Sequence, residues 1–406
     1  MNTHFQRYRS FLVLFGAGVL LSGCSFTPSS LVKPTLEQPE AFRSQAEPGS
    51  IWKSHDGAKT FEPKVTIDEK TKITTADVLS LSFLPPLPGA PTPTVAPGLF
   101  AGTIENGIVK TVNGADIWEV IPFPPKKVYS FTADKRNPGT MYATGVIAER
   151  GKIFRTKDDG QNWEDVYTEP GTGTVLVSLA EHPVNTSVIF AGTSAGTVVK
   201  STNGGDTWKN VGGTIDGPVV DILFDAKKKF VTYALIHNNK MYYSPDGGVS
   251  WLDWEKVKQE ERKKRMEAAS KRDDKGKAAA ALQKQLAEED KRKAPSAIVS
   301  LTADPTLTGV LWAGTANGLF RSKDFGKFWD EINVIESAKK FPIRALAISP
   351  RNSQEVVFAA GHVVYKSVDT GLTWAVVPVN VDREISTLVY DPYDAGQLYF
   401  GLRKFK

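Results

Sequence analysis

The chain has 406 residues, of which 41% are hydrophobic and 23% charged, so it is long enough and apolar enough to bury a sizeable core. Its 50 lysines and arginines exceed its 45 aspartates and glutamates, but the segment 255–293 alone carries 14 basic and 9 acidic residues. The rest of the chain after residue 23 has 34 basic and 36 acidic residues, which argues against a nucleic-acid-binding body.

The first 23 residues have the pattern of an export signal. Two arginines precede a short apolar stretch, Phe11–Leu21, and the segment ends in Leu-Ser-Gly before Cys24. This ending resembles a bacterial lipobox, in which the cysteine is acylated and becomes the mature N-terminus. Cys24 is the only cysteine in the chain, so it has no partner for an internal disulfide. We expect a lipid-anchored protein of the bacterial outer membrane, facing the periplasm or the outside; the alternative is a free cysteine in an ordinary signal peptide.

Residues 24–48 contain many Pro, Ser and Gln residues and are expected to form a flexible tether after the lipidated cysteine. Beyond them, an eight-residue motif returns seven times, with the full form Ser/Thr-x-Asp/Asn-x-Gly-x-Thr-Trp. The copies begin at Ser54, Thr111, Thr156, Ser201, Ser244, Ser322 and Ser367. Four of the six spacings lie close to 45 residues, and a period of this length is typical of a propeller or a solenoid.

Each repeat contains short segments rich in β-branched and aromatic residues that are separated by turn signals, which predicts four strands. In the repeat around Ser322 the expected strands are 298–305, 310–315, 318–322 and 329–333. Four antiparallel strands form one blade of a β-propeller. The sequence therefore predicts an all-β fold.

The two ends of the chain complement each other. The last repeat supplies only its first two strands, at 385–392 and 397–401, and the missing third and fourth strands occur at 51–54 and 62–67. We therefore predict a seven-bladed propeller over residues 49–406, closed by N- and C-terminal strands that pair in one blade. Six blades with a loose tail is the alternative, because the copy at Ser54 lacks the glycine at its fifth position.

Two spacings are longer than the period and indicate insertions. The first contains a Pro-rich stretch, 85–97, expected to be an extended loop between the first and second strands of a blade. The second contains the charged segment 255–294, whose many Glu, Lys, Arg and Ala residues predict a helical hairpin with a turn at 273–277. We place this hairpin in a connection between blades. It is either a solvated element or a contact surface for a protein, anionic lipid headgroups or a cell-wall polymer.

The repeated motif resembles the Asp box, or BNR repeat, of sialidases, xyloglucan-active glycosidases, sortilin-type receptors and photosystem II assembly/stability-factor-like propellers. The resemblance covers nearly all of the chain after the tether. It implies a structural motif, in which Asp or Asn and the Ser/Thr hydroxyl accept backbone N–H groups and Trp packs on the blade. The fifth-position glycine supplies a positive φ, so Ala58 and Ala115 predict turns that are either strained or differently shaped. The structural Asp-box residues are Ser54, Asp56, Asn113, Asp158, Asn203, Asp246, Asp324, Asp369, Trp118, Trp163, Trp208, Trp251, Trp329 and Trp374.

In the sialidase-like relatives the active site lies on the face away from the Asp boxes, so the resemblance makes that face the candidate binding face. Strand direction places the connections between blades there, including the charged hairpin, and the Pro-rich loop on the other face. Asp221 is a charged exception among small residues in the first strands, and Arg344 lies near enough in the repeat to pair with it. The candidate binding residues are Asp216, Asp221, Arg344, Asp382, Arg383 and Glu384.

Enzymatic signatures are weak. The Arg-Ile-Pro signature of sialidases is absent, the five histidines are scattered, and no Gly-rich phosphate loop precedes a helix, so we predict no catalytic residue, no metal and no cofactor. A glycoside hydrolase needs two carboxylates about 5–9.5 Å apart, for which the acidic residues of the candidate face remain available. We predict a lipid-anchored, non-enzymatic scaffold with a protein partner, most similar to the assembly/stability-factor-like branch. A glycan-binding protein or a glycoside hydrolase is the alternative.

Overall fold

The structure is a computed structural model that describes residues 48–83, 98–237, 240–272, 277–289, 295–316, 318–335 and 338–405, together with Ala46. The expected export signal, Cys24, almost all of the tether and the Pro-rich stretch 85–97 lie outside the described residues. Among the residues described, neither helix has an apolar stretch long enough to cross a bilayer.

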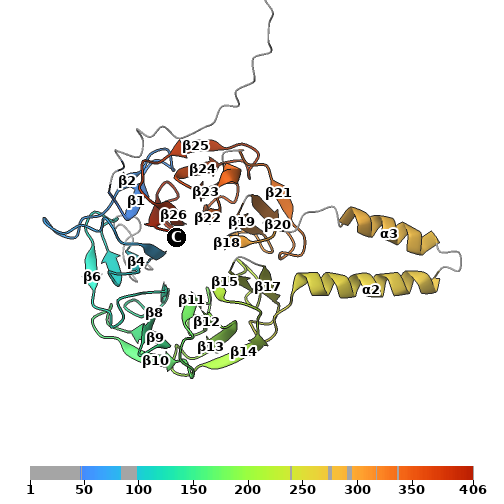
Figure 1. Ribbon diagram of the computed structural model, residues 1–406, viewed down its shortest axis with the longest axis horizontal. Coiled ribbons are helices and arrows are strands. Elements are labelled where there is room, and N and C mark those ends of the chain that lie inside the picture. The colour runs from blue at the N-terminus through green and yellow to red at the C-terminus, as the bar shows by residue number, and fades with distance from the viewer. Residues whose placement is uncertain are drawn as a thin grey trace, which may run out of the picture. The chain divides into compact units, whose positions relative to one another are not determined.

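The strands form seven antiparallel sheets that follow one another around a ring (Figure 1). Blade 1 contains β3 (Val78–Phe83), β4 (Leu99–Thr103), β5 (Ile108–Thr111) and β6 (Glu119–Ile121). Blade 2 contains β7 (Ser130–Ala133), β8 (Met141–Ile147), β9 (Arg150–Thr156) and β10 (Glu164–Thr168). Blade 3 contains β11 (Leu176–Glu181), β12 (Ile189–Thr193), β13 (Thr197–Ser201) and β14 (Lys209–Thr214).

Blade 4 has three strands, β15 (Val219–Phe224), β16 (Thr232–Ile236) and β17 (Met241–Ser244). Blade 5 contains β18 (Ile298–Ala303), β19 (Leu311–Thr315), β20 (Leu319–Ser322) and β21 (Asp330–Ile332). A short 3₁₀ helix, η1 (Ala338–Lys340), leads into blade 6, which contains β22 (Ile343–Ile348), β23 (Val356–Ala360), β24 (Val363–Ser367) and β25 (Ala375–Pro378). The first strand of each blade contacts the first strand of the next.

Blade 7 joins the two ends of the described chain and confirms the predicted closure. Its strand order is β2 (Glu62–Pro63), β1 (Ile51–Ser54), β27 (Leu398–Arg403), β26 (Glu384–Tyr390). Trp52 pairs with Phe400 in the antiparallel register of β1 and β27. The seven-bladed prediction is therefore confirmed and the six-bladed alternative is wrong, although β2 is shorter than the strand predicted over 62–67.

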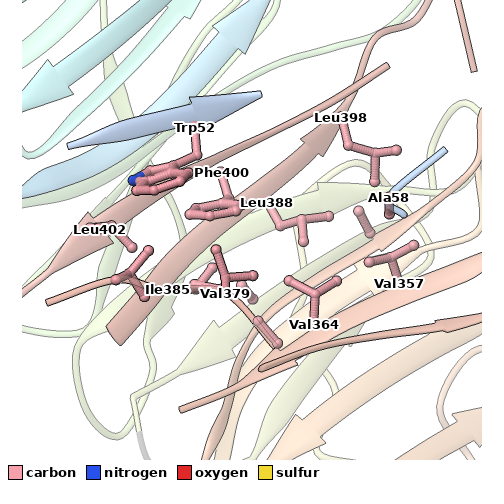
Figure 2. Close-up of a cluster of buried hydrophobic side chains, with 14 of the residues drawn as sticks. Trp52, Ala58, Val357, Val364, Val379, Ile385, Leu388, Leu398, Phe400 and Leu402 are labelled. Atoms are coloured by element: carbon pink, nitrogen blue, oxygen red, sulfur yellow. The ribbon is translucent and has the colours of Figure 1, made fainter. Parts of the chain in front are cut away.

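The hydrophobic core is divided among the spaces between neighbouring blades. Figure 2 shows one such cluster, in which Trp52, Leu388 and Phe400 of blade 7 face Val357 and Val364 of blade 6. The rings of Trp52 and Phe400 stack with centroids 6.0 Å apart. Because every blade shares a buried cluster with its neighbours, burial of apolar surface holds the ring together as well as each sheet.

Glycine in the second strand lets neighbouring blades approach closely. A Cβ atom on Gly314 would lie 2.3 Å from the Ile343 carbonyl oxygen of the next blade and 2.4 Å from Ser300 Oγ. The Ser300 hydroxyl donates a hydrogen bond to that same carbonyl at 2.6 Å. The small side chain of Ser300 in the first strand thus serves the contact between the two blades.

Blade 4 departs from the predicted four strands because a helix replaces its outer strand. Only Leu252 continues the sheet, in an isolated bridge to Tyr243, before α2 (Trp254–Arg272) begins. The Asp253 carboxylate accepts the Glu255 N–H at 3.0 Å, which satisfies one of the free N–H groups at the helix start. Helix α3 (Lys277–Glu289) packs against α2, so the predicted helical hairpin is present, and it extends outward from the edge of the ring (Figure 1).

Candidate functional site

The polar side chains of each Asp box form hydrogen bonds within the same turn. In the copy at Ser367, the hydroxyl donates to Asp369 Oδ1 at 2.7 Å and accepts the Gly371 N–H at 2.7 Å. The N–H of Thr373 donates to the same carboxylate at 2.9 Å. Hydrogen bonds, those from Thr373 first among them, lower the pKa of Asp369 to about 2. The carboxylate therefore stays ionised and occupied, which suits a structural role and not general acid catalysis.

The two copies with alanine at the fifth position form the same turn. Ala58 and Ala115 adopt φ angles of 66° and 73°, in the left-handed region that favours glycine. Their N–H groups still donate to the first hydroxyl of the motif, at 2.9 Å to Ser54 and 3.2 Å to Thr111. These turns are strained, as the sequence predicted, but they are not differently shaped.

In five of the seven blades a basic residue before the motif contacts the Asp box of the next blade around the ring. Lys53 donates to the Gly114 carbonyl at 2.9 Å, and Lys200 to the Gly247 carbonyl at 2.7 Å. Lys366 reaches the Gly57 carbonyl at 3.0 Å across the closure of the ring. Lys110 and Arg155 make the equivalent contacts to Asp159 and to Gly204. These repeated cations are therefore engaged with protein and do not form an open binding surface.

The first-to-second-strand turns lie on the same face as the Asp boxes. In six blades the fourth residue of the motif donates its N–H to a carbonyl of that turn, as Gly247 does to Phe230 at 2.7 Å and Thr370 to Gln354 at 2.9 Å. We call this side of the ring the Asp-box face, as defined by these two sets of turns. The turns between second and third strands and the connections between blades lie on the opposite face.

The hairpin is anchored at the Asp-box face, which corrects its predicted position on the opposite face. The Trp254 indole N–H donates to the Phe325 carbonyl at 2.8 Å, and its ring stacks on Tyr243 at 4.8 Å. Lys327 forms an ion pair with Glu261 at 2.6 Å. Phe325 and Lys327 belong to the Asp box of blade 5, and the hairpin starts there because it takes the place of the strand that follows the box of blade 4.

The opposite face carries a hollow of about 430 Å³ at the closure of the ring. Its lining residues come from the connection into blade 7, from the turn before blade 1, from the β23–β24 turn and from the C-terminal segment: Thr75, His362, Asp382, Arg383, Glu384, Arg403, Lys404 and Phe405. Of these residues, only Asp382, Arg383 and Glu384 were predicted from the sequence. The others were missed because closure brings together positions at the two ends of the chain.

Ion pairs hold both carboxylates of the hollow. Glu384 Oε2 accepts from Arg344 Nε at 3.0 Å, and Asp382 Oδ1 accepts from Arg383 Nε at 3.2 Å. The guanidinium of Arg344 also lies over the Phe405 ring, 4.0 Å from its centroid. The hollow thus combines an aromatic ring with charges of both signs, and Arg344 pairs with Glu384, whereas the sequence suggested Asp221.

Arg383, which the sequence predicted as a binding residue, also has a structural role. Its guanidinium donates to the carbonyls of Gly49, Thr74 and Ala76, each at 2.8 Å, and its side chain is only 9% exposed. These acceptors belong to the N-terminal part of the propeller, whereas Arg383 precedes β26. Arg383 therefore clamps the two ends of the chain together while forming one wall of the hollow.

The remaining two candidates lie elsewhere. Asp216 is an exposed residue in the connection into blade 4, and Asp221 lies on β15; neither lines the hollow. Burial raises the pKa of Asp221 to about 6, and its carboxylate accepts the Ile222 N–H at 2.9 Å. In the described part of the chain, no three His, Cys, Asp or Glu side chains are placed to hold a metal ion.

Comparison with known proteins gives likenesses to several propeller classes. The family model described as "Sortilin-Vps10: Sortilin, neurotensin receptor 3" matches residues 151–304. No curated protein matches the chain significantly. The fold is similar to that of the GH74 xyloglucanase from Xanthomonas campestris, with a TM-score of 0.60 and 16% identity over 81% of this chain and 51% of that one. The chain thus spans about half the length of that enzyme.

Two YCF48 structures match over nearly their whole length. The one titled "YCF48 bound to D1 peptide" gives a TM-score of 0.54 and 14% identity, covering 83% of this chain and 99% of that chain. YCF48 from Cyanidioschyzon merolae gives a TM-score of 0.53 and 17% identity, covering 80% and 95%. These likenesses establish the fold and agree with the classes that the Asp-box motif resembles.

Proposed function

We propose that this propeller is a non-enzymatic docking scaffold that binds a protein partner in the hollow at the ring closure. The observation that carries the proposal is the composition of the hollow, where the Arg344 and Arg403 guanidinium groups lie over the Phe405 ring and two carboxylates share the lining. An aromatic ring with charges of both signs suits a peptide, which offers apolar side chains and charged groups together. The similarly sized YCF48 propeller, whose structure is titled as bound to a D1 peptide, supports this choice.

The same geometry disfavours glycoside hydrolysis, the second candidate function. A glycosidase needs two carboxyl groups that are free to contact the sugar on either side of the scissile bond. In this hollow Glu384 and Asp382 are each engaged in an ion pair with a guanidinium of the protein. The likeness to GH74 enzymes covers only about half of the xyloglucanase chain, so it supports the fold and not the activity.

We expect the double variant Asp382→Ser/Phe405→Ala to bind the partner about tenfold more weakly, because it removes one charged group and the aromatic ring, a loss of about 1.4 kcal/mol. The partner is first crosslinked in the native envelope and identified, and its affinity for the purified chain is then measured by titration calorimetry. Asp216→Ser is the matched control, since Asp216 is an exposed aspartate in a connection that does not line the hollow.

An equal loss in the Asp216→Ser control, or no loss in the double variant, contradicts the assignment of the hollow. Release of reducing sugar ends from xyloglucan or sialylated oligosaccharides by the purified chain would favour the glycosidase alternative. Thermal unfolding of both variants is compared with that of the wild type, so that a loss of folding is recognised separately from a loss of binding.

We further propose that acylation of Cys24 anchors the scaffold to the bacterial outer membrane, on the strength of the lipobox-like ending of the export signal. Wild-type chain is expected in the outer-membrane fraction and to incorporate labelled palmitate. The Cys24→Ser variant is expected to lose the label. Labelling of the variant to the wild-type level contradicts the assignment of Cys24 as the acylated residue.

A further inference from the structure

The most exposed apolar side chains of the described residues gather on the Asp-box face. Six large apolar side chains are 56–83% exposed, and all six belong to turns of that face: Val112, Ile117, Phe230, Val249, Val368 and Leu372. On the opposite face the most exposed apolar side chain is Phe341, at 44%. The asymmetry between the faces shows that this exposure is not a general property of the surface.

The six side chains form three pairs that stand at separate points of the ring. Val112 and Ile117 belong to the Asp box of blade 1, and Val368 and Leu372 to that of blade 6. In blade 4 the carbonyl of Phe230 accepts the Gly247 N–H, which places Phe230 beside the box that contains Val249. We call these three pairs the apolar tips. Blades 1, 4 and 6 lie on different sides of the ring, so the three apolar tips are spread across the whole Asp-box face (Figure 1).

Basic side chains accompany the apolar tip of blade 4. Lys227 and Lys229 flank Lys228 immediately before Phe230, and both are exposed. The Lys228 ammonium lies over the Phe325 ring at 4.6 Å. A phenylalanine next to several lysines is typical of segments that contact anionic lipid, because the ring enters the interface while the ammonium groups meet headgroup phosphates.

The charged hairpin adds positive charge on the same side of the ring. Its first two turns are fixed to the Asp box of blade 5 through Trp254 and Glu261. The rest of α2, from residue 262 to 272, contains six basic residues and one acidic residue. The body of the chain without signal and hairpin is nearly neutral, so the hairpin, which starts directly after the Asp box of blade 4, carries most of the excess positive charge.

We propose that the Asp-box face rests on an anionic phospholipid bilayer, with the three apolar tips in the headgroup region and the basic groups of blade 4 and α2 on lipid phosphates. A bilayer is favoured as the occupant because three separated tips around the ring need a flat partner as wide as the propeller. A protein bound to one tip would leave the other two in water. The hollow faces away from this surface, so the proposal stands or falls independently of the proposed function.

The test places a fluorescent reporter on each face of the full chain. Cys24→Ser removes the only cysteine, after which Val249→Cys or Ile147→Cys provides a single labelling site on the Asp-box face or on the opposite face. Each labelled chain is mixed with vesicles of phosphatidylethanolamine and phosphatidylglycerol that contain a doxyl-labelled lipid. We expect at least threefold stronger quenching at position 249 than at 147, and weaker quenching at 249 on phosphatidylcholine vesicles.

Two double variants of the chain labelled at 249 separate lipid contact from unfolding. Phe230→Ser/Leu372→Ser is expected to lower the quenching at least twofold, whereas Val120→Ser/Val376→Ser, at comparably apolar positions on outer strands, is expected to leave it unchanged. Equal quenching at the two labelling sites, no quenching at 249, or an equal effect of the two double variants overturns the proposal. Protection of position 249 by a crosslinked protein, with no quenching by lipid, would assign the face to a protein partner.

Discussion

Replacing Arg383 by alanine is expected to destabilise the propeller by about 3 kcal/mol, because leaving one buried acceptor without its donor costs about 1–3 kcal/mol. The guanidinium donates to three carbonyls and to Ser50 Oγ, so the variant leaves these acceptors without their donor. The acceptors lie within residues 49–76 and Arg383 directly precedes β26. We therefore expect the variant to weaken the contact between the two ends of the propeller in blade 7. Urea unfolding measures the loss of stability.

Limited proteolysis of the Arg383→Ala variant is expected to cut first within residues 49–76. Arg344→Ala is the matched control, because that side chain is 25% exposed and its guanidinium bonds to Glu384 without crossing the closure. We expect the control to lose less than half as much stability and to keep the N-terminal segment protected. Equal destabilisation by the two variants would show that Arg383 is not a clamp between the ends.

Replacing Glu181 by glutamine is expected to stabilise the protein at pH 8 by about 2–4 kcal/mol, since each pKa unit corresponds to about 1.4 kcal/mol. Glu181 is 6% exposed, and one of its carboxylate oxygens has no hydrogen-bond partner among the described residues. Burial, with the nearby Asp134 carboxylate adding to it, raises the pKa of Glu181 to about 8. The folded state therefore holds a proton that the unfolded state releases near pH 4.5.

The direction in which stability changes with pH follows from this difference in bound protons. The wild type is expected to lose stability as the pH rises from about 4.5 to 8, and the loss is complete above pH 8. Glutamine resembles the protonated form and does not titrate, so the two proteins should differ little at pH 4.5 and most at pH 8. Thermal melts across this range check the result, with the exposed Glu119→Gln as control. A difference in stability between the variant and the wild type that is the same at every pH would show that Glu181 acts through packing alone.

The local chemistry of the blades could be predicted from the sequence because it depends on residues close together in the chain. Ser367 and Asp369 satisfy the turn that contains them, and the 45-residue period repeats this turn with its strands. The incomplete last repeat predicted that Ile51–Ser54 would complete the final blade, and β1 pairs with β27 there. Helix-forming composition likewise predicted α2 and α3, because helix formation rests on local hydrogen bonds.

Contacts between blades were decided by the tertiary structure. Arg383 lies 334 residues from Gly49, whose carbonyl it binds, and no pattern along the chain distinguishes it from an ordinary loop arginine. The hairpin leaves the ring at the Asp-box face because the Trp254 indole N–H donates to the Phe325 carbonyl of the neighbouring blade, while its ring stacks on Tyr243 of blade 4. By itself the sequence determined the number of blades, the closure and the turn chemistry, which depend on short-range hydrogen bonds and hydrophobic periodicity. Only the tertiary structure decided the hollow, the clamp and the side of the hairpin, because packing between blades joins residues that the sequence separates.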